Sequence, residues 1–111
     1  MVQAGLKPVL VDVSPKNLCL SGDYNDPVLA IHLLGAVSKV HSPLLLEDSC
    51  GAHGAMLGDQ KVGSLGKCAA FSFFFSHHIT TGEGGMITTS DENLLNACRS
   101  YRAHGWIRDK R

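Results

Sequence analysis

The sequence lacks an excess of charge of either sign, and it lacks any apolar run long enough to cross a membrane. Ten basic and ten acidic side chains balance over 111 residues. A neutral chain has no electrostatic attraction for nucleic acid or for an anionic lipid surface. The longest apolar runs fall far short of a bilayer span, and the N-terminus has no signal-peptide core. We therefore expect neither nucleic acid nor membrane as a partner.

Closely spaced cysteines are also lacking. Disulfide-rich scaffolds and zinc ribbons need cysteines in dense or paired arrangements. The four present here are far apart and form no C-x-x-C pair, which predicts reduced thiols in a cytoplasmic protein. They are Cys19, Cys50, Cys68 and Cys98.

Short apolar runs are the main structural signal. The chain is 44% hydrophobic and has room for one small domain at most. Near-continuous apolar runs of about four to eight residues are typical of strands in a parallel sheet that is covered on both faces. The expected strands are 8–13, 27–34, 43–46, 68–75 and 85–89.

One helix is predicted after the last strand. Ser90 or Asp91 can cap its free amides, and Gly105 follows its end. Its apolar face, at helical spacing, consists of Leu94, Leu95, Cys98 and Tyr101.

The connections between the first strands are unusually short. Segments 14–26 and 35–42 leave little room for the crossover helices that parallel strands normally need. The fold class predicted is therefore α/β, with a mostly parallel sheet and few helices. A parallel sheet without helices on both sides should expose an apolar face.

Two acids stand at the end of an apolar strand. Glu47 and Asp48 close the run 43–46 and precede small residues. Sites in open α/β sheets gather at the carboxyl ends of strands, where an Asp could hold a cationic ring nitrogen, as pyridoxal phosphate (PLP) enzymes require. The alternative is an acid that caps a helix or stabilises a turn.

Two adjacent histidines, His77 and His78, raise the question of a metal site. Together with Cys50 and His53 they could form a zinc set. However, neighbouring residues on an extended chain point in opposite directions, and the spacing lacks two tight ligand pairs. The residues thus speak against zinc.

A glycine-rich turn, TTGEGG, follows the histidines. Gly82, Gly84 and Gly85 permit positive φ and close backbone approach, but they do not form the G-x-G-x-x-G dinucleotide motif. Taken alone, the turn is a tight connection between strands. Ser72, taken alone, is an ordinary strand hydroxyl.

The order of these motifs is more specific than any one of them. An acidic strand end followed by HGA, VGSLG, SFFF, TTGEGG and YRAHGW resembles the DegT-type sugar aminotransferase family. The resemblance implies a fold-type I enzyme that uses PLP or pyridoxamine phosphate (PMP) on nucleotide-linked keto-sugars. It also implies that Asp48 pairs with the pyridine nitrogen and that Ser72 contacts the cofactor phosphate.

The catalytic position departs from the aminotransferases. They carry a lysine that forms a Schiff base with PLP where this sequence has His77. The same replacement marks the PMP-dependent 3-dehydratase branch, which removes the C3 hydroxyl of 4-keto-6-deoxyhexose nucleotides. An imidazole cannot hold the cofactor covalently, but it can move protons near neutral pH. The resemblance therefore implies that His77 is the catalytic base and that His78 is structural or supports the site without touching the reacting atoms.

The resemblance also bears on organisation and partners. It implies that residues 1–111 are a fragment of the cofactor-binding large domain, without its N-terminal part and without the small domain. A nucleotide sugar is the expected substrate, in deoxysugar or lipopolysaccharide biosynthesis, and the parent enzyme is expected to be a homodimer. Gly51 departs from the family, because it stands where aminotransferases carry Gln and dehydratases can carry Asp.

Other readings remain open. One is a nucleotide-sugar aminotransferase whose lysine lies elsewhere or is lost. Another is a degenerate remnant without cofactor, or a small binding module. Retention of the cofactor separates these last two from the enzymes.

Overall fold

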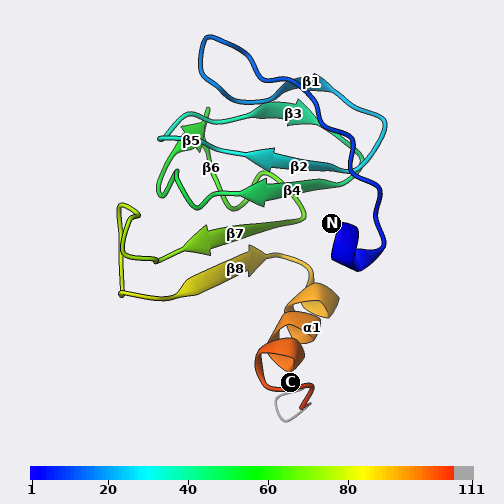
Figure 1. Cartoon of the computed structure of the whole chain (residues 1–111), viewed down its shortest axis with the longest axis vertical. Helices are drawn as coiled ribbons and strands as arrows, with labels where there is room; N and C mark the ends of the chain where they lie inside the picture. The colour runs from blue at the N-terminus through cyan, green and yellow to red at the C-terminus, as the bar shows by residue number, and fades with distance from the viewer. Residues whose placement is uncertain (107–111) are drawn as a thin grey trace.

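The computed structural model describes residues 1–106, which form a four-stranded sheet, two two-stranded sheets and an α-helix that follows the last strand (Figure 1). No helix in this part of the chain is long or apolar enough to span a membrane. The elements in chain order are η1 (Val2–Ala4), β1 (Ser21–Asp23), β2 (Val28–Ile31), β3 (Lys39–His41), β4 (Leu45–Asp48), β5 (Met56–Leu57), β6 (Gln60–Lys61), β7 (Cys68–Ser72), β8 (Gly85–Thr89) and α1 (Glu92–Arg102).

The main sheet has four strands in the order β2-β4-β7-β8. β2, β4 and β7 run parallel, and β8 is antiparallel to β7. This arrangement confirms the predicted α/β domain with a mostly parallel sheet. β8 has the predicted bounds, whereas β7 ends at Ser72 because its pairing with β8 stops at Gly85.

Extended segments replace the missing crossover helices. In the sequence, β1 comes before β2, and β3 comes after β2 and before β4. β1 and β3 pair in parallel with each other and form a separate two-stranded sheet. In Figure 1, β3 runs opposite to β2 and β4. Pairing between β1 and β3 gives these two segments some of the backbone hydrogen bonds that a crossover helix would form internally.

The predicted strand at 8–13 was wrong. Val9 and Leu10 are 80% and 94% exposed, and the segment forms no strand. An apolar run becomes a strand only where a neighbouring strand supplies hydrogen bonds and burial. The composition of a segment does not show whether a neighbouring strand is available to supply them.

The buried face of the main sheet carries the core. Side chains from β7 pack there against the segment that leads from β4 to β7, which includes the β5–β6 hairpin. The cluster consists of Val37, Val62, Ala69 and Phe71, with Ala55, Leu57 and Leu65 packed against it.

The opposite face of the main sheet is open. Leu29, Ile31 and Ile87 are 43%, 54% and 52% exposed. Strand register places Ile31, Asp48, Ala70 and Ile87 in one row across this face. The predicted exposed apolar face is confirmed, and Asp48 lies in its middle.

The helix α1 begins after Asp91, one of the two predicted cap residues. Asp91 accepts a hydrogen bond from the Leu94 N–H at 2.9 Å and forms an ion pair with Lys67. The hydrogen bond from Lys67 holds the pKa of Asp91 below its usual range. α1 extends away from the end of β8 (Figure 1), and Tyr101 is 85% exposed. Only part of the predicted apolar helix face is therefore covered.

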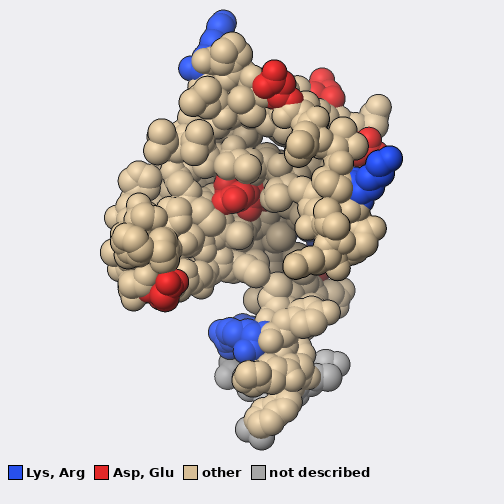
Figure 2. Space-filling view, in the orientation of Figure 1, with Lys and Arg blue, Asp and Glu red and all other residues tan. Residues whose placement is uncertain are grey.

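Thiols and charges behave as the composition suggests. The four cysteines are free, which agrees with the predicted reduced thiols. On the face shown in Figure 2, acidic and basic side chains are scattered among uncharged residues, without a continuous patch of one sign.

Candidate active site

β4 and β7 bring Asp48 and Ser72 to the same edge of the sheet. The strands are parallel neighbours, with Asp48 opposite Ala70, so their carboxyl ends lie side by side (Figure 1). Ser72 follows Ala70 by two residues and therefore points to the same face as Asp48. Two residues advance a strand by about 7 Å. The Asp48 carboxylate and the Ser72 hydroxyl thus lie on the open face, on neighbouring strands, with an offset of two residues along the strand direction.

Asp48 is oriented by the chain that follows it. The Cys50 N–H donates to its Oδ1 at 3.1 Å, and the Cys50 thiol donates to the Ala70 carbonyl oxygen at 3.8 Å. Burial, and then the Asp48 carboxylate, raise the pKa of Cys50 to about 11. The thiol therefore keeps its proton at neutral pH and is a poor nucleophile.

Ser72 is half-buried at the end of β7. Its Oγ accepts a hydrogen bond from the Phe74 N–H at 3.2 Å. That contact occupies an oxygen lone pair, so the hydroxyl proton remains able to donate to an anion on the open face.

The turn after β7 is closed by backbone and threonine contacts. The Phe73 N–H donates to the Gly84 carbonyl at 2.9 Å, and the Thr81 N–H donates to the Phe73 carbonyl at 3.0 Å. A Cβ at Gly84 would lie 2.7 Å from Thr81 Oγ1, and Gly82 has φ +83°. Gly82 and Gly84 therefore fit the shape of the GEGG turn better than residues with a side chain would.

His77 lies in this turn, five residues beyond Ser72. Its N–H donates to the Phe74 carbonyl at 3.0 Å, which fixes the backbone. Within residues 1–106, no hydrogen bond or ring contact joins its imidazole to Asp48 or Ser72. The structure thus brings Asp48 and Ser72 together and leaves the His77 ring without a fixed partner.

Glu47 has a structural role that the sequence did not reveal. Its side chain is fully buried and accepts hydrogen bonds from the N–H groups of Gly63, Leu65 and Gly66 at 2.8–2.9 Å. His32 Nε2 lies 3.1 Å from Glu47 Oε2. These contacts tie β4 to the VGSLG segment that leads into β7. Strand alternation, which points neighbours to opposite faces, was the signal that could have separated Glu47 from Asp48.

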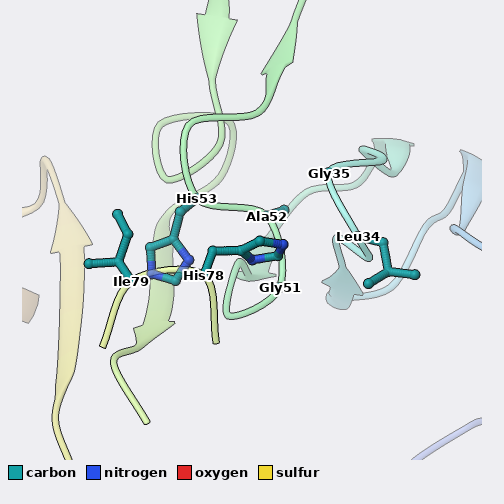
Figure 3. Close-up of a pocket in the computed structure, with 7 residues that line it drawn as sticks. All are labelled: Leu34, Gly35, Gly51, Ala52, His53, His78 and Ile79. Atoms are coloured by element: carbon teal, nitrogen blue, oxygen red, sulfur yellow. The ribbon is translucent and has the colours of Figure 1, made fainter. Parts of the chain in front are cut away.

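A pocket of about 180 Å³ lies beside the turn. Figure 3 shows His53 and His78 side by side, with Gly51 and Ala52 next to them. The lining residues come from the segments that follow β2, β4 and β7. They are Leu34, Gly35, Gly51, Ala52, His53, His78 and Ile79.

His53 and His78 were also candidate metal ligands in the sequence. Within the part of the chain that the structure describes, no three His, Cys, Asp or Glu side chains converge as a metal site would require. The Cys50 thiol faces Ala70 and Asp48, while His53 and His78 line the pocket.

Comparison with known proteins gives the class. Residues 1–111 match the DegT/DnrJ/EryC1/StrS aminotransferase family, and the chain belongs to it. A GDP-4-keto-6-deoxy-D-mannose 3-dehydratase of Yersinia pseudotuberculosis is 37% identical over 96% of this chain and 32% of its own length. A GDP-perosamine synthase of Caulobacter vibrioides is 38% identical over 96% of this chain and 33% of its own length.

Solved structures give the same class of fold. A GDP-4-keto-6-deoxy-D-mannose-3-dehydratase of E. coli with bound hydrated PLP matches with a TM-score of 0.74 and 31% identity, over 88% of this chain and 30% of its own. A mutant GDP-4-keto-6-deoxymannose-3-dehydratase with bound GDP-perosamine matches with a TM-score of 0.76 and 30% identity, over 91% and 31% of the two chains. The chain spans about a third of the length of these proteins.

The residues present fit the cofactor of this family. PLP or PMP needs an anionic partner at its pyridine nitrogen and donors at its phosphate. Asp48 presents a carboxylate on the open face, and Ser72 presents a hydroxyl that can still donate, on the neighbouring strand. Both groups lie at the carboxyl ends of their strands, where ligands of open α/β sheets bind.

Proposed function

We propose that this chain is part of a PMP-dependent enzyme that removes the C3 hydroxyl from a nucleotide-linked 4-keto-6-deoxy sugar. The observation that carries the proposal is His77, in the turn between Ser72 and the GEGG glycines, where the aminotransferases have their lysine. The 3-dehydratases among the similar proteins support the same activity.

Each of the three site residues has one task in this proposal. The bound cofactor supplies a conjugated ring that accepts electrons. Asp48 keeps a proton on the pyridine nitrogen by electrostatic pairing, because an adjacent anion favours the protonated ring. Ser72 would donate a hydrogen bond from its hydroxyl to the cofactor phosphate. An imidazole nitrogen of His77 would act as the general base that accepts a proton from the amine-bearing carbon of bound PMP.

The proposed setting follows from the same class. The chain would form part of the cofactor-binding large domain of a homodimeric, cytoplasmic enzyme in deoxysugar or lipopolysaccharide biosynthesis. Its partner would be the nucleotide sugar, without nucleic acid or membrane. The open face around Ile31 and Ile87 supports this setting, since further parts of a larger domain would cover it.

A nucleotide-sugar aminotransferase is the second candidate. Its support is the similarity to the GDP-perosamine synthase. It requires an amine-bearing side chain in the place of His77, or a lysine from another part of the enzyme. A third candidate is a degenerate, non-catalytic remnant of either enzyme.

Product analysis separates the candidates. The enzyme is incubated with PMP and GDP-4-keto-6-deoxymannose, with and without L-glutamate, and the sugar is followed by mass spectrometry and NMR. Loss of the C3 hydroxyl supports the dehydratase. A sugar with an amino group at C4 and its C3 hydroxyl retained would show an aminotransferase instead of a dehydratase. An unchanged sugar would support the non-catalytic remnant.

A further inference from the structure

We propose that His32 is a positioning residue for the candidate active site, and that it holds the Asp48 carboxylate where the ring nitrogen of the cofactor would meet it. This inference rests on the proposed function, because it explains how one of the proposed site residues is oriented. The His32 ring lies on the buried face of the sheet, so it acts through Asp48 and not by touching the cofactor or the sugar.

The His32 ring is enclosed and fully hydrogen-bonded. The residue directly follows β2 and is 1% exposed. Its Nδ1 accepts a hydrogen bond from the Ser38 N–H at 3.1 Å, and its Nε2 lies 3.1 Å from Glu47 Oε2. Because Nδ1 is the acceptor, the ring proton is on Nε2 and is donated to the Glu47 carboxylate. Both ring nitrogens are used, and the ring has one orientation.

Glu47 carries this anchor to β4. Its Oε2 also accepts a hydrogen bond from the Gly63 N–H at 2.8 Å. Its Oε1 accepts from the N–H groups of Leu65 and Gly66 at 2.9 and 2.8 Å. A buried carboxylate in such a network cannot shift without leaving donors unpaired. The strand is therefore fixed from its buried face at the residue immediately before Asp48.

The backbone of His32 holds the other side of Asp48. β2 and β4 are parallel neighbours (Figure 1), and the His32 N–H donates to the Asp48 carbonyl oxygen at 2.9 Å. In the same peptide group, the Ser49 N–H donates to the Ala70 carbonyl oxygen of β7 at 2.9 Å. His32 thus contacts β4 twice, with its ring at Glu47 and with its N–H at Asp48.

These contacts fix the direction of the Asp48 side chain. Strand alternation sends this side chain to the open face because Glu47 points to the buried face. The Asp48 Oδ1 accepts a hydrogen bond from the Cys50 N–H, which belongs to the turn after β4. A binding group must be held within about 0.5 Å of its productive position. That precision requires the backbone of β4 to be held as well, and His32 and Glu47 hold it.

Two substitutions separate the two contacts of the ring. His32→Gln places an amide nitrogen near the position of Nε2, so it can still donate to Glu47 but gives up the bond from the Ser38 N–H. His32→Asn places an amide oxygen near the position of Nδ1, so it keeps the bond from Ser38 and gives up the contact with Glu47. Each variant loses one hydrogen bond of the ring, so the pair distinguishes the contact with Glu47 from a general loss of packing.

The Cys50 thiol reports the place of Asp48 without any cofactor. Burial, and then the Asp48 carboxylate, raise the pKa of this thiol to about 11, so a carboxylate that moves away lets it ionise and react faster. At pH 8 we expect His32→Asn to raise the rate of Cys50 alkylation about fivefold and His32→Gln to change it less than about twofold. In an Asp48→Asn background, His32→Asn should add nothing, because the group that it displaces is absent.

Two results would overturn the proposal. An equal increase with and without the Asp48 carboxylate would show general loosening of the fold, and equal rates in the two His32 variants would show that the contact with Glu47 has no effect on Asp48. If His32→Asn does not fold, Glu47→Gln takes its place in the same two backgrounds. It should then raise Cys50 alkylation only where Asp48 is present, and an unchanged rate would count against the proposal equally.

Cofactor binding is the second measurement. In the enzyme that includes this chain, His32→Asn should weaken PMP binding about 10-fold, and His32→Gln should weaken it less than about threefold, because residues in contact couple on this scale. Calorimetric titration measures both affinities. PMP bound by His32→Asn as tightly as by the parent would refute the positioning role, even in an active dehydratase. Failure of the proposed function would look different, since the parent would then bind no PMP or leave the sugar unchanged while the Cys50 results stand.

Discussion

Glu47 and Asp48 are neighbours on β4 and point to opposite faces of the sheet. The Glu47 carboxylate is fully buried and holds three backbone N–H groups of the segment before β7. The Asp48 carboxylate lies in the middle of the open face, and in the strand register it is opposite Ala70, two residues before Ser72. One acid therefore fixes how β4 and β7 meet, and the other lies on the open face at that junction, where we propose that it binds the cofactor.

Removing the charge of Glu47 should destabilise the fold. Glu47→Gln replaces one acceptor oxygen by an amide donor that faces backbone N–H groups. Loss of a buried, charge-assisted network costs about 3 kcal/mol. Urea unfolding at pH 7 measures this free energy. Asp59→Asn, at an exposed position, is the matched control and should stay within about 0.5 kcal/mol of the parent. An equally small effect for Glu47→Gln would contradict the structural role.

Gly66 should be more sensitive to a methyl group than Gly54. A Cβ at Gly66 would lie 2.4 Å from the Leu45 carbonyl oxygen, so backbone must move. Gly54 has open space around it and only the strain of φ +77°. We expect Gly66→Ala to lower the unfolding free energy by about 3 kcal/mol and Gly54→Ala by about 1 kcal/mol. The reverse order in denaturant titrations would show that the β4 contact is wrongly placed.

Local signals in the sequence predicted the local parts of the fold. The bounds of β8 and the Asp91 cap depend on adjacent residues, and both were predicted. β1 and β3 were missed because each becomes a strand only by pairing with the other across intervening chain. The segment 8–13 was mistaken for a strand because its apolar composition does not say whether a partner edge exists.

The site shows the same division. Asp48 and Ser72 were predicted as site residues from a strand end and from the order of the motifs, and the structure shows that they lie on neighbouring parallel strands. His53 was noticed only as a possible metal ligand. Its two unsatisfied nitrogens depend on how Phe71 and Phe73 enclose the ring, which no spacing reports.

The Cys50 thiol should react slowly and respond to Asp48. Burial and the Asp48 carboxylate raise its pKa from 9.0 to about 11. At pH 8 a rise of two units lowers the thiolate fraction about 100-fold, and alkylation follows the thiolate. The rate of alkylation of the Cys50 thiol, followed by mass spectrometry, should therefore be low in the parent protein and higher in the Asp48→Asn variant. A rate independent of the residue at 48 would exclude its influence.

The same shift gives a pH dependence with a definite sign. Because the pKa is raised on folding, the protonated thiol favours the folded state. This contribution is fully present below the unfolded pKa near 9 and is lost as pH rises through about 11. Cys50→Ser removes the titration, so the difference in unfolding free energy between parent and variant should change between pH 9 and 11. A constant difference across that window would refute the assignment.

His77 should control turnover more than cofactor binding. In the enzyme that includes this chain, His77→Asn should lower the rate of C3 dehydration by about 10²–10⁴-fold, the range for a lost general base. The affinity for PMP should change little, because Asp48 and Ser72 are the residues proposed to hold it. Steady-state kinetics and calorimetric titration measure the two quantities. His104→Asn is the matched control, since His104 is exposed at φ +59°, a conformation that Asn tolerates.

A lysine at the same position tests what the histidine prevents. His77→Lys places an amine where the aminotransferases have one, so PLP should become covalently attached to it. Borohydride reduction followed by mass spectrometry should then find the cofactor on residue 77, and dehydration should fall. No attachment would mean that position 77 does not reach the cofactor. Together with full activity of His77→Asn, that result would place the base elsewhere and remove the main support for a dehydratase.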